Sequence, residues 1–572
     1  MQKETFIKQY AAGLNPQQLA AVQAVHGPVL LLAVPGSGKT TVLVTRLGYM
    51  VLCCDVPPAQ ILTMTYTVAA THEMRGRFAA RFGADLAGQM TFRTINGLSA
   101  VILQYYSRVY GRRQPELLTN EGDITRMLTD IWQQVNREFP TESTLKELRT
   151  AITYIKNMAL ADEEIEGLET DLANLPELYR RYQAALKRAG QMDYDDQMVF
   201  ALQILRAAPP VLAYFQQRYK YFCVDESQDT SKIQHEIIRL LAGRSLNLFM
   251  VGDEDQSIYG FRAAYPQALM DFEQVYPGAQ VLLMEENYRS SEEIVAAANA
   301  FVARSRYRRP KTLRATQGAQ CPIEIRRITR REEQIDWLFK EARRGGGETA
   351  VLFRNNESAL PLVDLCERRV VPYRFKKADL TFFTHKIVLD AVDFLRFAYE
   401  PTNGERFLRL YYKFGLALSR QRALAACGAS ARTGRPILEE LIRDSETKTR
   451  MRESLGDIYA AFKRIPQLNA ADALDAVRHG CGYGAYLNQK GMDTGKLAIL
   501  EMLAEQEPNA LRLLDRLEEL RMLIAAKAYV NSDVPFVLST IHSSKGLEYD
   551  RVVLLDAFDG VLPAKPEICC RT

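Results

Sequence analysis

Several signals that would place the chain in other protein classes are absent from its 572 residues. It has no run of about 20 apolar residues, and its first residues lack the charged-then-apolar layout of a secretory signal. Its nine cysteines form no Cys-x-x-Cys pair and no Cys/His cluster at zinc spacing. We therefore expect a cytoplasmic protein with no membrane partner, whose cysteines are reduced thiols, mostly buried.

The composition is close to that of an average globular protein. Hydrophobic residues make up 47% and charged residues 25%, which argues against a disordered or fibrous chain. The formal net charge is only +4, so it does not identify a polyanionic partner, and any nucleic-acid surface must be local. At about 150 residues per domain, the length predicts roughly four domains.

Apolar runs of strand length alternate with helix-like segments. Residues 29–32 form an apolar run that leads through a Gly-rich turn into a helix-like stretch with Leu43, Leu47 and Met50 on one face, and a second run follows at residues 61–65. This βαβ pattern predicts a parallel sheet. Further apolar runs lie at residues 221–224, 248–251, 281–284, 349–353 and 552–555.

Two long segments between these runs are rich in Leu, Ala, Glu, Arg and Gln, a composition typical of helices. We therefore predict an α/β protein with two parallel-sheet cores, each interrupted by a helical insertion. The predicted first core comprises residues 1–98 and 206–285 around an insertion at 99–205. The predicted second core comprises residues 286–380 and 531–572 around an insertion at 381–530.

A Gly-rich segment follows the first apolar run and reads Ala33-Val34-Pro35-Gly36-Ser37-Gly38-Lys39-Thr40-Thr41. It matches the phosphate-binding loop of nucleotide hydrolases, except that Ala33 stands where the pattern has its first glycine. Small residues let consecutive backbone N–H groups turn toward phosphate oxygens at a helix N-terminus. The pattern predicts ATP or GTP binding, with Lys39 neutralising the β and γ phosphates and Thr40 holding Mg²⁺. A Gly-rich turn with a solvated lysine is the alternative.

An acidic cluster, Asp225-Glu226-Ser227-Gln228-Asp229, follows directly after the apolar run at residues 221–224. Acids at the carboxyl ends of parallel strands lie at the edge where such sheets bind ligands. Together with the phosphate loop, the cluster predicts that Asp225 takes Mg²⁺ and that Glu226 orients and deprotonates the attacking water. Taken alone, such a strand end is more often a helix cap.

Further motifs accompany the phosphate loop and the acidic cluster at residues 225–229. They are Leu14-Asn15-Pro16-Gln17-Gln18, Thr65-Tyr66-Thr67, Val251-Gly252-Asp253-Glu254-Asp255-Gln256-Ser257-Ile258-Tyr259-Gly260-Phe261-Arg262, Asn287-Tyr288-Arg289-Ser290 and Thr540-Ile541-His542-Ser543-Ser544-Lys545-Gly546-Leu547-Glu548-Tyr549. With these motifs the chain resembles the UvrD/Rep-type superfamily 1 DNA helicases, in which they correspond to the Q motif and to motifs Ia, III, IV and V, and residues 225–229 to motif II. The resemblance implies two RecA-like cores with ATP in the cleft between them, and a DNA-dependent ATPase and helicase that moves 3′ to 5′ along single-stranded DNA.

The resemblance also implies roles for single residues at the nucleotide. Gln18 would read adenine and Tyr288 would stack on it, since a glutamine offers a paired donor and acceptor to an adenine edge. Gln256 and Arg289 would contact the γ-phosphate, and Glu548 would approach the nucleotide. Singly, Arg289 could instead be a surface ion pair and Tyr288 a core aromatic.

A translocase needs cations for phosphates and aromatic rings on which bases of any sequence stack. The resemblance places Tyr66, Tyr259 and Phe261 in this stacking role, Arg262 beside them, and His542 in motif V among the DNA-binding residues. Packing of these aromatics under the sheet is the alternative. The expected partners are single-stranded and tailed duplex DNA, and the sequence does not identify protein partners or a pathway.

Two charge features bear on DNA binding. Where the family typically has Asn-Lys after motif Ia, this chain has Val68-Ala69, which predicts a weaker hold on the strand. A run of six cations without an acid could bind phosphates or form a solvated face. These residues are Arg304, Arg306, Arg308, Arg309, Lys311 and Arg314.

The family continues past motif V into motif VI, a Thr-Arg-Ala-Lys signature whose arginine reaches the γ-phosphate, and nothing similar follows Tyr549. We therefore expect a second core that is incomplete, and a chain that binds ATP and single-stranded DNA but unwinds poorly by itself. A hydrolysis-impaired ATP- and DNA-binding protein is the alternative. The motor part of a helicase-nuclease is a further alternative, but the sequence has no additional carboxylate cluster typical of a nuclease.

Overall fold

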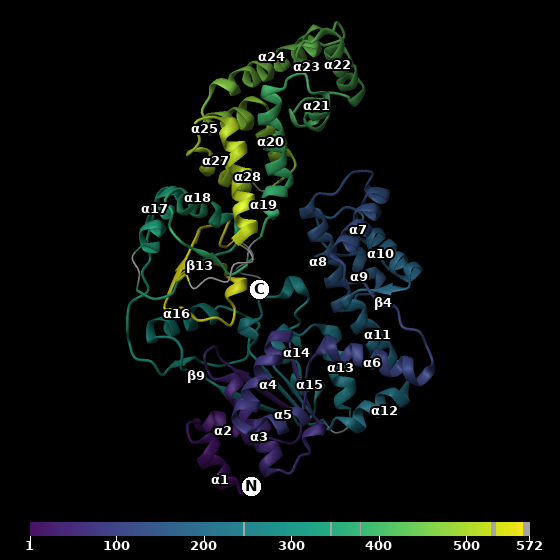
Figure 1. The fold of residues 1–572 in the computed structure, drawn as a ribbon, viewed down its shortest axis with the longest axis vertical. Helices are drawn as coiled ribbons and strands as arrows, with labels where there is room; N and C mark the ends of the chain where they lie inside the picture. The colour runs from purple at the N-terminus through teal and green to yellow at the C-terminus, as the bar shows by residue number, and fades with distance from the viewer. Residues whose placement is uncertain (244–245, 344–345, 378, 493, 528–533, 564–572) are drawn as a thin grey trace. The chain divides into compact units, whose positions relative to one another are not determined.

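The computed structural model describes residues 1–243, 246–343, 346–377, 379–492, 494–527 and 534–563 (Figure 1). The chain divides into two compact units, residues 1–140 with 144–325, and residues 326–571 with 141–143. Both units contain a parallel sheet flanked by helices, as predicted. Residues 286–325, which the sequence analysis assigns to the second core, group with the first unit.

The first unit is built on a six-stranded parallel sheet with the order β3-β2-β6-β7-β1-β8. Five of these strands lie on the apolar runs found in the sequence, whereas β3 was not predicted. The strands are β1 (Val29–Ala33), β2 (Ile61–Thr65), β3 (Thr91–Thr94), β6 (Tyr221–Val224), β7 (Leu248–Gly252) and β8 (Gln280–Met284).

Both faces of this sheet are buried, because successive strand residues point to opposite faces and every residue of β1, β2 and β7 is buried. Leu31 belongs to the core on one face and its neighbour Leu30 to the core on the other. The first face is covered by α1 (Lys3–Phe6), α2 (Pro16–Gln23), α3 (Lys39–Cys53), α4 (Val68–Phe82) and α5 (Ala84–Gln89). The second is covered by α6 (Ile95–Tyr110), α11 (Tyr194–Ala207), α12 (Pro209–Arg218), α13 (Lys232–Ala242), α14 (Gln267–Met270) and α15 (Phe272–Val275).

The first helical insertion has a hydrophobic core of its own, separate from the two sheet cores. It is narrower than the predicted residues 99–205, because α6 and α11 pack on the sheet. Two short strands, β4 (Glu116–Leu117) and β5 (Gln191–Met192), pair at the two ends of its chain segment. Its helices are α7 (Glu121–Asn136), α8 (Glu142–Met158), α9 (Asp162–Glu166) and α10 (Leu175–Ala189).

A buried lysine joins this insertion to α11. The Nζ atom of Lys156 lies 2.6 Å from Asp193 and 2.8 Å from Asp196, and its side chain is 1% exposed. Removing one partner of a buried ion pair leaves uncompensated charge, which costs about 3–5 kcal/mol. We expect Lys156→Met to lower the free energy of unfolding of this region by that amount, and the exposed Lys187→Met to leave it unchanged.

Calorimetry on the full chain, with hydrogen exchange in α8 and α10 to locate the effect, measures this difference. Equal unfolding temperatures and exchange rates for the two variants would contradict the structural role of Lys156.

No single helix in the described ranges is long and apolar enough to cross a membrane. The bent pair α11 and α12, whose axes differ by 102°, passes a test of length and composition when the two helices are taken together. Met198, Leu202 and Phe215 of this pair lie in the core on the second face of the sheet.

The second unit contains a four-stranded parallel sheet with the order β12-β13-β11-β14. Its strands are β11 (Thr349–Phe353), β12 (Arg374–Phe375), β13 (Phe536–Thr540) and β14 (Arg551–Leu554). Among the described residues β14 is an edge strand, and its Val552 and Leu554 are 54% and 47% exposed. Residues 564–572, where the predicted second core ends, lie outside the described residues.

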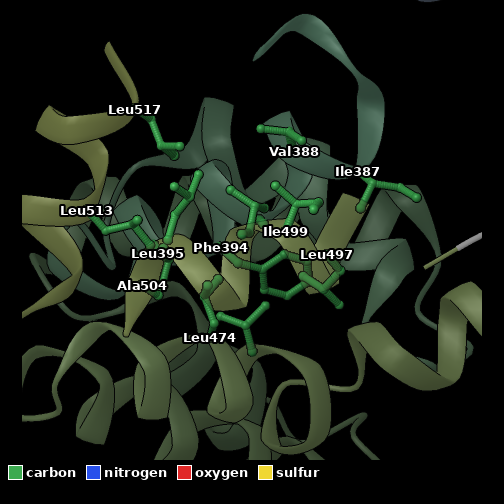
Figure 2. Close-up of a cluster of buried hydrophobic side chains, with 14 of the residues drawn as sticks. Ile387, Val388, Phe394, Leu395, Leu474, Leu497, Ile499, Ala504, Leu513 and Leu517 are labelled. Atoms are coloured by element: carbon green, nitrogen blue, oxygen red, sulfur yellow. The ribbon is translucent and has the colours of Figure 1, made fainter. Parts of the chain in front are cut away.

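The predicted second insertion shares one continuous hydrophobic core with this sheet. Figure 2 shows Phe394 and Leu395 of α20 (Lys386–Tyr399) meeting Leu474 of α25 (Ala470–Asp475) and Leu497 of α27 (Gly495–Ala504). The same core includes Leu538 of β13. The remaining helices are α17 (Arg331–Ala342), α18 (Leu360–Arg368), α19 (Thr381–Thr384), α21 (Gly404–Leu410), α22 (Arg420–Thr433), α23 (Ile437–Arg443), α24 (Thr449–Arg464), α26 (Tyr483–Gln489) and α28 (Ala510–Lys527).

The cysteines within the described ranges carry free thiols. Cys223, Cys366 and Cys481 are buried, whereas Cys321 is exposed and the others are half-buried. The expectation of mostly buried thiols therefore holds for only three of these cysteines.

Candidate active site

The Gly-rich loop connects the carboxyl end of β1 to the first turn of α3. Gly36 and Gly38 have φ values of 67° and 80°, in the left-handed region that favours glycine. A Cβ atom on Gly36 would lie 2.8 Å from Cβ of Arg289, so this position also requires glycine for space. Ser37 donates from Oγ to the carbonyl of Val34 at 2.6 Å, which closes the loop. Helix α3 therefore begins directly after Gly38, so the backbone N–H groups of its first turn lie at the end of the loop, where the sequence predicts a phosphate.

The lysine of this loop faces the acids at the end of β6. Lys39 Nζ lies 3.4 Å from a carboxylate oxygen of Glu226. Burial, and then the charge of Glu226, raise the pKa of the neighbouring Asp225 to about 6, while Lys39 opposes the shift. Glu226 has a φ of 50°, a left-handed conformation that is uncommon for residues other than glycine. The structure thus brings together the two elements that the sequence predicts to act on phosphates.

A glutamine for which the sequence predicts no separate role joins these acids to the end of β7. Gln228 donates from Nε2 to Glu226 and accepts from the backbone N–H of Asp253 at 3.1 Å. Asp253 in turn accepts from Gln256 Nε2 at 2.6 Å. A Cβ atom on Gly252 would lie 2.9 Å from Gln228, so the two strand ends approach closely. In the sequence, only the position of Gln228 within the acidic cluster indicates that it could act at this site.

The segment after β8 wraps the phosphate loop. Its short strand β9 (Glu286–Asn287) pairs with β10 (Arg314–Ala315), and α16 (Glu292–Val302) lies between them in the sequence. Asn287 Nδ2 donates to the carbonyl of Pro35 at 2.7 Å, and the N–H of Tyr288 donates to that of Gly36 at 3.0 Å. These contacts hold Tyr288 and Arg289 beside the phosphate loop, and their contacts with ATP stay a prediction.

Gln18 occupies a buried position between the Q motif and the phosphate loop. Its side-chain oxygen accepts from the N–H of Asn15 at 3.0 Å, completing a helix-capping box. Its Nε2 donates to the carbonyl of Ser37 at 2.9 Å. Asn15 Nδ2 also donates to the hydroxyl of Tyr288 at 2.9 Å, so the two residues expected at adenine lie at one place. Both polar atoms of the Gln18 amide therefore already have partners in the protein. A hydrogen bond from Gln18 to adenine stays a prediction.

Three aromatic rings, which we call the aromatic strip, gather after β2 and β7: Tyr66, Tyr259 and Phe261. The rings of Tyr66 and Tyr259 are nearly parallel, with an interplanar angle of 8° and centroids 6.2 Å apart. The guanidinium of Arg262 lies 5.5 Å from the ring centroids of both Tyr259 and Phe261. Phe261 is 48% exposed, so the alternative of packing under the sheet does not apply to it.

His542 and Glu548 lie in the second unit, His542 in a short helical turn after β13 and Glu548 in the loop before β14. The other candidate residues of the nucleotide and DNA sites lie in the first unit.

Three of the six cations at residues 304–314 do not fit the hypothesis of a phosphate-binding surface, because they pair with acids of the protein, whereas Arg304, Arg306 and Arg314 are exposed. Arg308 pairs with Asp255 at 2.9 Å and Arg309 with Glu273 at 2.8 Å. Lys311 is buried among three carboxylates. Tertiary structure brings these cations to acids that lie about 35 to 60 residues earlier in the sequence, so the cations are neutralised within the protein.

In the part of the chain that the structure describes, no group of three or more His, Cys, Asp or Glu side chains is arranged to hold a metal ion. Mg²⁺ usually binds through one or two protein ligands and substrate phosphates, keeping several waters. Asp225 at the end of β6 and Thr40 in the first turn of α3 match that donor chemistry.

A phosphate-binding loop after the first strand of a parallel sheet, facing the acidic end of a second strand, defines the class of P-loop nucleoside triphosphatases. Two family models match this chain: the UvrD/REP helicase N-terminal domain over residues 14–277 and the UvrD-like helicase C-terminal domain over residues 282–449 and 497–569. The chain therefore belongs to the UvrD/REP helicase family.

Several curated relatives are similar over nearly the whole chain. The chain is 29% identical to ATP-dependent DNA helicase PcrA of Leuconostoc citreum, over 96% of this chain and 77% of that protein. It is 28% identical to ATP-dependent DNA helicase UvrD1 of Mycobacterium tuberculosis, over 96% and 78%. It is 27% identical to ATP-dependent DNA helicase PcrA of Bacillus subtilis, over 97% and 79%.

Proposed function

We propose that the chain is an ATP-dependent DNA helicase whose ATP hydrolysis is stimulated by single-stranded DNA. This proposal is supported most directly by residues 253–262, because this segment connects the predicted hydrolysis site to the aromatic strip. This one segment holds Gln256, which is linked through Asp253 and Gln228 to Glu226, and also two rings of the aromatic strip. A change at the γ-phosphate therefore has a short covalent and hydrogen-bonded route to bases stacked on the strip.

The charges at the site support hydrolysis of a phosphoanhydride. Glu226 accepts the proton of the attacking water, and Lys39 and Arg289 stabilise negative charge on the transferring phosphoryl group. Asp225 and Thr40 would hold Mg²⁺, which supplies further charge neutralisation at the phosphates when bound. Gln256 and, from the second unit, Glu548 complete the proposed contacts with ATP.

The DNA part of the proposal rests on the aromatic strip and on the relatives, which are named as ATP-dependent DNA helicases. Arg262 adds a cation beside the rings, and His542 of the second unit is proposed as a further DNA contact. Movement from 3′ to 5′ and a preference for single-stranded or tailed duplex DNA follow from the family resemblance. The proposed location is the cytoplasm, supported by DNA as the substrate.

The subdivision into two cores, each with a helical insertion, also stays a proposal. It is supported by the separate hydrophobic core of α7, α8, α9 and α10.

ATP hydrolysis measured with and without single-stranded DNA, followed by strand displacement on 3′-tailed and 5′-tailed duplexes, tests the function. We expect stimulation by DNA, and we expect any strand displacement to be confined to the 3′-tailed duplex; displacement at a rate typical of the family would contradict the expectation of poor unwinding. Binding of ATP and DNA without turnover would instead identify a binding protein, and displacement from the 5′ tail would overturn the proposed direction.

Phe261→Ala tests the aromatic strip. Base stacking on an aromatic side chain contributes about 1–3 kcal/mol per base, so we expect the Kd for single-stranded DNA to rise by about 5- to 150-fold. Fluorescence anisotropy with a labelled oligonucleotide measures it. Phe301→Ala, which removes a 75% exposed ring on α16, is the matched control, and equal Kd values for both variants would contradict the stacking role.

A further inference from the structure

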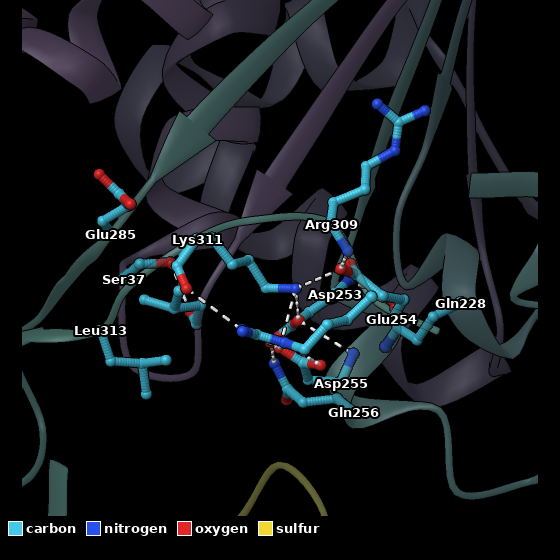
Figure 3. A network of polar contacts seen from close by, with 12 residues as sticks. Ser37, Gln228, Asp253, Glu254, Asp255, Gln256, Glu285, Arg309, Lys311 and Leu313 are labelled. Atoms are coloured by element: carbon cyan, nitrogen blue, oxygen red, sulfur yellow. Dashed lines mark hydrogen bonds and ion pairs between the residues drawn. The ribbon is translucent and has the colours of Figure 1, made fainter. Parts of the chain in front are cut away.

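A lysine with a fully buried side chain lies at the centre of the acidic turn that follows β7 (Figure 3). We call residues 253–256 the acidic turn. The Nζ atom of Lys311 lies 3.0 Å from Asp253, 2.6 Å from Glu254 and 2.9 Å from Asp255. Burial alone would lower the pKa of Lys311, but the charges of Asp253 and Glu254 outweigh it and raise the pKa above its usual value. The ammonium therefore stays charged and is the common counter-ion of all three acids.

Arg308 reinforces this arrangement from the same segment. Its Nε and Nη2 donate to both carboxylate oxygens of Asp255, at 3.1 and 2.9 Å, and Nη2 also donates to the carbonyl of Lys311 at 3.1 Å. The N–H of Arg309 donates to Glu254 at 2.8 Å. A bidentate arginine fixes the plane as well as the distance of a carboxylate. We call Arg308 and Lys311 the cationic clamp.

The clamp acts on groups that reach the hydrolysis site. Asp253 receives the hydrogen bond of Gln256, and its backbone N–H is held by Gln228, which also contacts Glu226. Asp253 itself is 0% exposed, so solvent does not screen its charge. Without Lys311, three neighbouring carboxylates would repel one another in a water-poor site, and the turn that orients Gln256 would open.

We propose that the cationic clamp of Lys311 and Arg308 positions Gln256 and Glu226 for ATP hydrolysis by holding the acidic turn closed. This inference rests on the proposed ATPase function. Lys311 and Arg308 are positioning residues, because they act on the phosphate-contacting side chains through Asp253 and Asp255. Arg308 and Lys311 thereby acquire a role in hydrolysis in place of a contact with DNA phosphates.

Lys311→Met in the full chain tests the proposal. We expect kcat for DNA-stimulated ATP hydrolysis to fall by about 10- to 100-fold, the range for misplaced but intact active-site groups, with the Kd for ATP unchanged. Because the clamp acts on Gln256 as well as on Glu226, the loss should be clearly smaller when Lys311→Met is introduced into a Gln256→Ala background, since effects within one network are not additive. A purely structural role would give additive losses.

Arg309→Gln is the matched control, because its side chain binds the carbonyls of Leu269 and Met270 and not the acidic turn. It is expected to lower the unfolding temperature and leave kcat unchanged. If Lys311→Met does not fold, Arg308→Met replaces it, with Arg308→Lys expected to restore part of kcat. Wild-type kcat in Lys311→Met, or additive losses with Gln256→Ala, would overturn the inference. A wild type without ATP turnover would overturn the proposed function itself.

Discussion

We expect Glu226→Gln to lower kcat for ATP hydrolysis by about 10²- to 10⁴-fold, the usual contribution of a positioned general base. The substitution keeps the size of the side chain but removes the carboxylate that accepts the proton of water. Gln228 Nε2, which donates to Glu226, would then face an amide, and Lys39 would lose the partner that lies 3.4 Å away. Affinity for ATP should be retained or increased, because one negative charge near the phosphates is removed.

Single-turnover hydrolysis together with equilibrium binding of a fluorescent ATP analogue separates the two effects. Glu236→Gln on α13, whose carboxylate pairs with Arg206 and Arg239 at the surface, is the control and should hydrolyse ATP normally. Full turnover in Glu226→Gln would assign the general base to another residue. A variant that no longer binds ATP would show that Glu226 holds the loop together and would contradict its role as a base.

The first sheet could be predicted from the sequence wherever a strand is apolar on both faces. Strand β1 is a continuous apolar run, and β7 is apolar up to its final glycine, because helices cover both sides of the sheet. Strand β3 was missed because it lies at the edge and carries only one apolar residue, Phe92, among polar ones. Strand β13 was missed because its apolar run, residues 536–538, is too short to distinguish a strand from a helix by pattern.

The phosphate loop could be predicted because its chemistry depends on neighbouring residues. The spacing of Gly36, Gly38 and Lys39 determines where the N–H groups and the ammonium lie, whatever the rest of the fold does. The cationic clamp could not be predicted in this way. Lys311 and its three carboxylates are far apart in the sequence, and a run of cations without acids is typical of a solvated surface. Only tertiary structure shows that the charges are paired.

Tertiary contacts also explain why residues 286–325 group with the first unit. The sequence places Asn287 and Arg289 in a motif, but the motif does not say which core they pack against. Val34 of the phosphate loop shares a small hydrophobic cluster with Val295 of α16 and Leu313. This cluster and the hydrogen bond from Asn287 to Pro35 tie the segment to β1.

Because residues 286–325 are attached to the phosphate loop, we expect Arg289→Ala to have a large effect on ATP hydrolysis. Asn287 Oδ1 accepts from the N–H groups of Arg289 and Ser290 at 2.9 and 2.8 Å, while its Nδ2 holds the carbonyl of Pro35. The backbone of Arg289 is therefore fixed to the phosphate loop, and Cβ of Arg289 lies where a side chain on Gly36 would clash. An arginine placed there by the backbone needs little reorganisation to meet a γ-phosphate, which is the condition for electrostatic stabilisation of the transition state.

We expect Arg289→Ala to lower kcat/KM for ATP hydrolysis by about 10³- to 10⁵-fold, the range measured for arginines that contact the transferring phosphoryl group. Arg289→Lys should recover only part of this loss, since an ammonium cannot form the paired hydrogen bonds of a guanidinium. Arg314→Ala, which removes an exposed arginine from the partner strand β10, is the control and should hydrolyse ATP normally.

Binding of single-stranded DNA without nucleotide should be unchanged in all three variants. If Arg289→Ala weakened that binding as much as it slowed hydrolysis, the arginine would support the fold of the segment and not the reaction. A loss confined to hydrolysis would place Arg289 at the γ-phosphate, because the anchored backbone allows its side chain to be removed without moving the loop.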